Sequence, residues 1–185
     1  MMTAEKLLPF VAAFGWLVTK YLTTIWFPWE TSAQLGTFVH LFAILGLAVW
    51  VAQHQNIGGK ANEQPFLDAL ISVLRVAFRY VLLGTLAVGA WYFAINSKGL
   101  EARKAEQATR IQEAFGSDEA FEQTLEVAPE LFGGDREVML QNQLETLEMY
   151  YSAPFHLGFA LLGLAVAGLA FSLFVTWIWR LIWRP

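Results

Sequence analysis

The polar residues with the clearest capacity for a specific contact lie at the start of an otherwise apolar segment. Spacings of four, three and four residues separate Asp68, Ser72, Arg75 and Arg79. One helix would therefore carry all four on the same face. Guanidinium groups bind phosphate and carboxylate oxygens, so Arg75, Arg79 and Asp68 form a candidate site for an anionic lipid headgroup or a partner protein. The simpler alternative is a polar stripe that faces water beside a membrane.

Three further basic residues lie within apolar segments or at their edges: Lys20, His40 and His156. A lysine that faces hydrocarbon is costly, so we expect Lys20 to point into the protein, to reach the headgroups, or to pair with a carboxylate such as that of Glu30. Two histidines at similar depth could relay a proton or ligate haem iron. Because no second histidine pair accompanies them, we interpret them as hydrogen-bonded packing residues and predict no cofactor.

Several reaction classes are excluded by what the sequence lacks. The chain has no cysteine, which removes iron–sulfur clusters, thiolate zinc sites and cysteine nucleophiles. It also has no glycine-rich phosphate loop, no HExxH motif and no GxSxG motif. Asp68 is the one acidic residue close to the interior of an apolar segment, so the carboxylate pair typical of an ion-coupled pathway is missing. We assign no catalytic residue and no metal ligand.

The elements that must position these residues are membrane-spanning helices. Hydrophobic residues make up 56% of the 185 residues and charged residues 15%, which is too apolar for an average soluble domain. A helix rises about 1.5 Å per residue, so a crossing of about 30 Å needs about 20 apolar residues. Four stretches meet this length: Leu7–Phe27, Leu35–Ala52, a third that begins at Phe66 and is continuously apolar over Val76–Ile95, and Phe155–Ile182. We interpret the first stretch as a retained span, because it is longer than the apolar core of a signal sequence.

The basic residues near these stretches set the expected orientation. Most of them fall on one side of the membrane: Lys6, Lys60, Arg75, Arg79, Arg180 and Arg184. The turn after the first span has none. The positive-inside tendency therefore predicts a multi-pass membrane protein with both termini in the cytoplasm.

Aromatic residues are expected at the two headgroup layers, because their amphipathic rings prefer this environment. The inner layer would hold Trp50, Tyr80, Trp177, Trp179 and Trp183, and the outer layer Trp26, Trp29, Trp91, Tyr92, Tyr150 and Tyr151. Trp16 alone among the tryptophans is expected deep in the membrane.

Residues 97–154 differ sharply from the rest of the chain. They contain five basic and twelve acidic residues, which gives this segment a net charge of −7. In the predicted topology this insert is extracytoplasmic. Its charge does not conflict with that orientation, because a loop of this length is near the limit at which lysine and arginine control orientation. Its acidity excludes a nucleic-acid surface, which needs clustered positive charge.

The insert is expected to be helical. Hydrophobic residues recur at helical spacing in two stripes: Phe121, Leu125, Ala128 and Phe132, then Leu140, Leu144, Leu147 and Tyr151. The sequence GGD at 133–135 predicts a turn between them, and Pro129 predicts that the first helix ends or kinks near Ala128. We therefore predict an antiparallel helical pair. Residues 100–115 lack a strong apolar face and are predicted to continue the third span outward until Gly116 stops the helix.

The fourth apolar stretch carries a stripe of small residues at spacings of three, four and three: Ala160, Gly163, Ala167 and Ala170. Small side chains let helices approach closely, so this stripe predicts a packing seam. Gly84, Ala87 and Gly89 of the third stretch are candidates for its complement. The sequence leaves open whether the seam lies within one chain or joins two copies.

Three parts of the sequence follow one another in a recognisable order. The first consists of the runs FLDALISVLRVAFRYVLLG and YFAINSKG. The second is the acidic helical insert, and the third is the final run SAPFHLGFALLGLAVAGLAFSLFVTWIWRLIWRP. Together they resemble a family of bacterial four-pass membrane proteins, over about the last two thirds of the chain. The resemblance implies an amphipathic lead-in to the third span, a charged helical segment after it and a fourth span rich in small residues. It also implies a location in the bacterial inner membrane, but no activity, because no catalytic motif is shared.

We therefore expect an all-α protein, a four-helix transmembrane bundle with a small extracytoplasmic helical cap between the third and fourth spans. Residues 1–96 would hold the first three spans, 97–154 the insert, and 155–185 the fourth span with a basic cytoplasmic tail. The expected function is that of a non-enzymatic accessory or scaffolding protein that contacts membrane lipids, other membrane proteins or a second copy of itself. A small transporter or channel is the main alternative, and a membrane enzyme acting on a lipid-linked substrate is the third.

Overall fold

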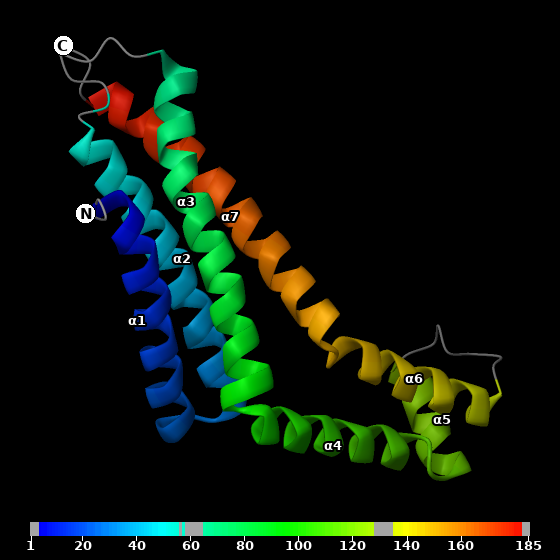
Figure 1. The fold of residues 1–185 in the computed structure, drawn as a ribbon. Coiled ribbons are helices and arrows are strands. Elements are labelled where there is room, and N and C mark those ends of the chain that lie inside the picture. Colours follow the sequence, from blue (N-terminus) through cyan, green and yellow to red (C-terminus); the bar gives the residue numbers. More distant parts are fainter. Residues whose placement is uncertain (1–3, 56, 58–64, 128–134, 183–185) are drawn as a thin grey trace. The chain divides into compact units, whose positions relative to one another are not determined.

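A computed structural model describes residues 4–55, 57, 65–127 and 135–182 (Figure 1). These residues contain helices and turns but no strand, which confirms the all-α prediction. In chain order the helices are α1 (Ala4–Trp26), α2 (Trp29–His54), α3 (Phe66–Gly89), the π-helical η1 (Ala90–Ile95), α4 (Ser97–Ala114), α5 (Asp118–Val127), α6 (Arg136–Tyr150) and α7 (Ala153–Ile182).

The chain divides into two compact units. The first, here called the bundle, comprises Met1–Val88 and Leu157–Pro185. The second, the insert unit, comprises Gly89–His156. The insert unit therefore begins earlier in the chain than the acidic composition suggested, because η1 belongs to it.

Helices α1 and α2 form a hairpin in the bundle (Figure 1). Pro28 separates them, because a proline has no N–H to donate and disfavours helical geometry in the residue before it. Its φ of −55° and ψ of 158° are extended. The indole Nε1 of Trp16 donates a hydrogen bond of 2.8 Å to the carbonyl of Gly36. This buried bond fixes the register of α1 against α2.

Helix α3 is more enclosed than the two helices on either side of it. Buried residues number ten of 24 in α3, eight of 26 in α2 and five of 30 in α7. Gly84 lies at the contact with both neighbours, since an added Cβ there would be 3.2 Å from Leu164 of α7 and 3.4 Å from His40 of α2. The centre of α3 is therefore the point where three helices of the bundle meet.

The contact between α3 and α7 uses a different stripe from the predicted seam. The buried residues of α7 are Leu164, Gly168, Ser172, Val175 and Thr176. The predicted stripe lies to one side of this line: Ala160 and Ala167 are half-buried, whereas Gly163 and Ala170 are exposed. The physical reason is that the close approaches are made elsewhere: Gly84 of α3 accommodates Leu164, and Gly168 of α7 accommodates Val81. A role for the small-residue stripe in association with another helix stays a prediction.

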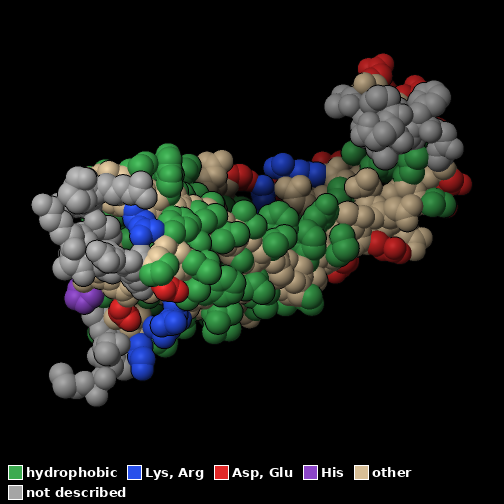
Figure 2. Space-filling model, turned by 90° about the horizontal axis from the view of Figure 1, so that it is seen from above, with side chains coloured by type: hydrophobic (Ala, Val, Ile, Leu, Met, Phe, Trp, Pro, Cys, Tyr) green, Lys and Arg blue, Asp and Glu red, His purple; other side chains and the backbone are tan. Residues whose placement is uncertain are grey.

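Three helices are long and apolar enough to cross a membrane: Glu5–Trp26 within α1, Trp29–His54 and Ala153–Ile182. Helix α3, which carries the charged residues Asp68, Arg75 and Arg79, is not among them. The crossing by α3, and with it the count of four spans, stays a prediction. Figure 2 shows hydrophobic side chains gathered over one face of the bundle, and Phe14, Phe42 and Phe159 are 67%, 70% and 70% exposed. Such surfaces suit a lipid environment better than water.

The insert unit begins with a change of helix type. The backbone N–H of Asn96 bonds to the carbonyl of Trp91 at 2.7 Å, a spacing of five residues, and Asn96 itself leaves the helical conformation with φ −118° and ψ 33°. The prediction that residues 100–115 continue the third span as one helix is therefore wrong. Gly99 permits this break, because a Cβ there would lie 2.5 Å from the Asn96 Oδ1.

Helices occupy the predicted places in the insert unit, but their pairing differs. Helix α5 ends at Val127, and the predicted turn at Gly133 and the proline at Pro129 lie outside the described residues. Asp135 begins α6 as its cap, where the carboxylate accepts a hydrogen bond of 2.8 Å from the Glu137 N–H.

The partner against which α6 mainly packs is α4, not α5 as the antiparallel pair predicted. The inward face of α4 mixes apolar residues with the alkyl stems of charged ones, and so it does not read as an apolar stripe. Leu100 and Phe115 are its buried members, and Lys104 lies half-buried between them. The Phe115 ring also contacts the Phe121 ring of α5, with centroids 5.4 Å apart.

The α3–α7 contact provides a test of the bundle. Replacing Gly168, where a Cβ would already lie 3.4 Å from Val81, by leucine should overpack this contact and lower the free energy of unfolding by about 1–3 kcal/mol. Gly163→Leu on the same helix is the matched control, since a Cβ there meets no described atom within 4 Å. Unfolding in mixed detergent micelles measures both. Equal effects of the two substitutions would contradict the observed orientation of α7.

Candidate functional site

A cluster of polar side chains joins α1 to α2 inside the bundle. The Lys20 Nζ donates a hydrogen bond of 3.0 Å to the Ser32 Oγ, and the hydroxyl oxygens of Thr23 and Thr24 each lie 3.1 Å from the same Ser32 oxygen. Lys20 is 3% exposed and Ser32 1%. Of the orientations considered for Lys20, the structure has the inward one. The ammonium group is thus kept from hydrocarbon and bonds to the Ser32 hydroxyl of the next helix, while Thr23 and Thr24 of its own helix lie against the same hydroxyl.

Small residues on α2 make the room for these side chains. Ser32, Gly36 and His40 follow one another at four-residue spacing and share one buried face. A Cβ at Gly36 would lie 3.4 Å from the Lys20 Cδ and 3.5 Å from the Trp16 Nε1. A larger residue at position 36 would therefore push Lys20 and Trp16 away from α2.

His40 links this α1–α2 contact to α3. Its ring stacks on Trp16, with centroids 4.4 Å apart and an interplanar angle of 22°. Its Nδ1 lies 2.7 Å from the hydroxyl of Tyr80, which is fully buried. The Nε2 has no hydrogen-bond partner within the described part of the chain. Which of the two ring atoms carries the proton depends on the tautomer, and a donor role for Tyr80 leaves Nε2 as the protonated nitrogen.

Together these residues form one polar strip across three helices. It comprises Lys20 and Trp16 of α1, Ser32, Gly36 and His40 of α2, and Tyr80 of α3. The amine, imidazole and phenol can each exchange a proton, but the described contacts commit them to holding helices together. No aspartate or glutamate takes part in these described bonds.

Sequence reasoning had singled out Lys20 and His40 but had not joined them. Ser32 was not considered, although its four-residue spacing from Gly36 and His40 on an apolar helix was a usable signal. Tyr80 was expected in the headgroup layer, and this is wrong because its hydroxyl is turned inward to His40. The position of a tyrosine along a helix does not reveal which face carries it until the neighbouring helix is placed.

Two further buried hydroxyls lie on α7. Ser172 and Thr176 are both fully buried, and their side-chain oxygens have no hydrogen-bond partner among the described residues. They share the buried stripe of α7 with Gly168, one turn apart from each other. Such groups are costly in a dry interior, so they mark positions where the bundle departs from purely apolar packing.

Arg79 contacts the start of α1, for a reason that lies in the sequence of α1. In a helix the N–H of residue 9 would bond to the carbonyl of residue 5, but residue 9 is a proline and has no N–H. The Arg79 guanidinium donates a long hydrogen bond of 3.4 Å to this carbonyl of Glu5. Arg79 therefore supplies the donor that Pro9 cannot.

The other two members of the predicted arginine face are open to the surroundings. Arg75 and Asp68 are exposed, whereas Arg79 is half-buried. Binding of a lipid or partner by this face stays a prediction, with Arg79 already engaged by the Glu5 carbonyl.

His156 lies in the insert unit, apart from the unit that holds His40. Three aromatic rings surround its ring, with centroid separations of 5.6 Å to Tyr92, 5.9 Å to Phe93 and 6.1 Å to Tyr151. Its Nδ1 is buried without a described hydrogen-bond partner. The described residues bring together no group of three histidine, aspartate or glutamate side chains that could hold a metal ion.

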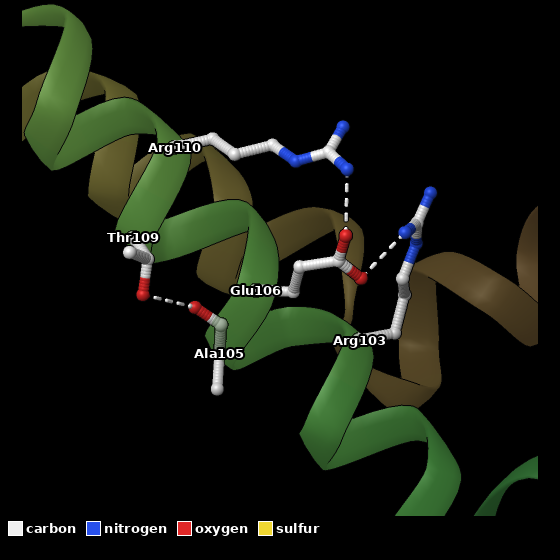
Figure 3. A network of polar contacts seen from close by, with 5 residues as sticks. All are labelled: Arg103, Ala105, Glu106, Thr109 and Arg110. Carbon is white, nitrogen blue, oxygen red and sulfur yellow. Dashed lines mark hydrogen bonds and ion pairs between the residues drawn. The ribbon is translucent and has the colours of Figure 1, made fainter.

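Charged side chains connect the helices of the insert unit. On α4, Glu106 accepts bonds of 2.6 Å from both Arg103 and Arg110 (Figure 3). Between α4 and α6, the Lys104 Nζ donates to the Glu148 carboxylate at 2.7 Å. The Arg103 hydrogen bond is the main cause that lowers the pKa of the Glu106 carboxyl, and the Glu148 hydrogen bond is the main cause that raises the pKa of Lys104.

A further ion pair, between Arg136 of α6 and Asp118 of α5, also lies at the surface of the insert unit. Exposed pairs of this kind contribute little stability each, because water and salt screen them. These ion pairs hold charged side chains in defined positions on the surface of the insert unit.

The chain matches no family model, no curated protein and no solved structure. The resemblance to four-pass bacterial membrane proteins therefore stays an expectation, and the site is interpreted from its own geometry.

The bond between His40 and Tyr80 can be tested by removing one or both partners. Tyr80→Phe leaves the His40 Nδ1 buried without its partner and should lower the unfolding free energy by about 1–3 kcal/mol. The double variant Tyr80→Phe with His40→Leu should lose less than the sum of the single variants. Tyr21→Phe, at a tyrosine that is 56% exposed, is the control and should change stability by less than about 0.5 kcal/mol. Strict additivity of the two single effects would show that the bond is not formed.

The role of Arg79 predicts a coupling with Pro9. Arg79→Met should destabilise the protein less when Pro9 is also replaced by alanine, because alanine restores the N–H that bonds to the Glu5 carbonyl. A coupling energy of about 0.5–1.5 kcal/mol is expected from a double-mutant cycle in detergent. Arg75→Met, at the exposed arginine one turn earlier, should show no coupling with Pro9→Ala. A coupling as large for Arg75 would refute the assignment.

Proposed function

We propose that this protein is a non-enzymatic, multi-pass integral membrane protein that acts as an accessory or scaffolding component for other membrane proteins. In this proposal α3 also crosses the membrane, which gives four spans, both termini lie in the cytoplasm of a bacterial cell, and the insert unit lies outside the inner membrane. The basic residues of α3 and of the end of α7 support this orientation through the positive-inside tendency. The resemblance to four-pass bacterial membrane proteins agrees with it.

The observation that carries the proposal is the use made of the polar residues in the bundle. Lys20 bonds to Ser32, and His40 bonds to Tyr80, so the groups best suited to chemistry serve as contacts between helices. Exposures of 3% and 6% for Lys20 and His40 leave little of either side chain open to a substrate. The surfaces open to other molecules are apolar on the bundle and charged on the insert unit.

Helix α6 is the surface best suited to a protein partner. None of its 15 residues is buried within the described part of the chain. Val138 and Met149 are 56% and 52% exposed, which is high for apolar residues on an otherwise charged helix. A helix that buries so little against its own chain gains from packing against another protein.

A small transporter or channel is the second candidate, and one specific observation favours it. The Nε2 of His40, the hydroxyl of Ser172 and the hydroxyl of Thr176 are buried polar atoms without described partners in the same unit. Water or a translocated ion could satisfy such atoms. Flux assays in liposomes with the purified protein test this directly, and we expect no flux above that of empty liposomes.

Site-specific photocrosslinking in native membranes tests the scaffolding proposal. A photoreactive amino acid at position 138 or 149 should give one discrete adduct, with a second copy or another membrane protein, whose mass is the same in repeated preparations. The control position is Glu119 on α5, an exposed residue on the same unit. If positions 138 and 149 give no adduct above that control, α6 is not a partner surface and the proposal fails.

A further inference from the structure

A small cavity lies between the start of α3 and the end of α7 in the bundle. Its volume is about 240 Å³, and its walls are Phe66, Trp177, Arg180 and Leu181. Three of these residues stand at spacings of three and one on α7, so one face of its last turns forms one wall. Phe66, the first residue of α3, forms the other. The cavity therefore depends on the packing of two segments that are far apart in the sequence.

Arg180 is the cation among the described residues that line this cavity. The Arg180 guanidinium carbon lies 5.9 Å from the centroid of the Phe66 ring, within the range of a cation–π contact. Arg180 is also the basic residue of the last turn of α7. Contact with the ring holds the guanidinium at the cavity, and its planar donors match the oxygens of a phosphate.

The end of a candidate spanning helix is the depth at which headgroups lie. Helix α7 is apolar enough to cross a membrane over Ala153–Ile182, so Arg180 falls within its final residues. The cavity thus combines a phosphate-binding donor with aromatic and aliphatic walls at the boundary between headgroup and hydrocarbon.

An exposed apolar track leads away from the cavity along α7. Val166, Leu169, Leu173 and Trp177 are 60%, 48%, 40% and 55% exposed and recur at spacings of three and four. They span twelve residues, or about 16 Å of helix, which is close to half of a hydrocarbon core of about 30 Å. This length matches one leaflet, the distance that an acyl chain covers.

We propose that the cavity and this track bind an anionic phospholipid, whose phosphate accepts hydrogen bonds from Arg180 and whose acyl chain lies along α7 from Trp177 to Val166. A cavity whose described lining is Arg180 with aromatic and aliphatic residues suits an amphiphile better than a free anion, because a free anion gains nothing from the aromatic and aliphatic walls. The inference rests on the membrane location in the proposed function but not on the scaffolding role.

Native mass spectrometry of the full chain, released from nanodiscs that contain phosphatidylglycerol and phosphatidylcholine in equal amounts, tests the proposal. The wild-type protein should retain phosphatidylglycerol in preference to phosphatidylcholine. Arg180→Gln should lower the retained phosphatidylglycerol by about tenfold, as expected for loss of a charge-assisted bond. Arg110→Gln, which removes an exposed arginine of the insert unit, is the matched control and should change nothing.

Any of three results from this experiment would overturn the proposal: equal retention of the two lipids by the wild type, no effect of Arg180→Gln, or an equal loss with Arg110→Gln.

Inorganic phosphate added at millimolar concentration should not displace the lipid, and efficient displacement would identify the site as one for free phosphate. If Arg180→Gln does not fold, a photoactivatable phosphatidylglycerol on the wild type replaces it, and adducts must map to Phe66, Trp177 or Leu181. Adducts elsewhere would refute the site. A failure here leaves the α6 crosslinks unaffected, so it is distinguishable from a failure of the scaffolding proposal.

Discussion

The bundle depends on one constraint: polar groups that leave water inside a membrane protein must find partners within the protein. Lys20 and Ser32 satisfy each other across α1 and α2, and His40 and Tyr80 do so across α2 and α3. Because each bond joins two helices, the register of three helices follows from satisfying four side chains. Glycines at positions 36 and 84 make these approaches possible, since an added Cβ at either would crowd Lys20 or His40.

The need for hydrogen-bond partners within the protein applies to the backbone as well. Pro9 leaves the Glu5 carbonyl without its helical donor, and Arg79 from a distant helix supplies a replacement at 3.4 Å. An arginine near the start of an apolar helix thus has a structural use in addition to its preference for headgroups. At the other end of α3, the bond from Asn96 to the Trp91 carbonyl adds a π-helical turn where the chain enters the insert unit. The first irregularity follows from the residue type, because proline has no N–H, whereas the second is a bond between backbone groups.

These constraints separate the groups that hold the helices together from the surfaces open to other molecules. Lys20, Ser32, His40 and Tyr80 hold the helices of the bundle together. The surfaces left for other molecules are the apolar exterior of the bundle, the cavity at the end of α7 and the charged helices of the insert unit. In the insert unit the ion pairs are exposed and weak individually, and α6 buries no residue of its own. The buried apolar side chains of Trp91, Leu100 and Phe115 therefore contribute more to the stability of this unit than its ion pairs do, while its charges lie at the surface.

Composition and periodicity determined the helical class, the long apolar helices and the acidic insert, because these follow from local hydrophobicity. They also showed that Lys20 should not face hydrocarbon, because an unpaired charge there is costly. The face that each helix turns inward was decided only by tertiary packing. Tyr80 looked like a headgroup residue until α2 placed His40 opposite it, and the small-residue stripe of α7 gave way to one centred on Leu164, which fills the space at Gly84. Likewise α6 packs against α4, although apolar residues do not recur at a clear helical spacing on the half-polar face of α4. Pairing between helices depends on shape and on partners far away in the chain, and a one-dimensional pattern does not contain that information.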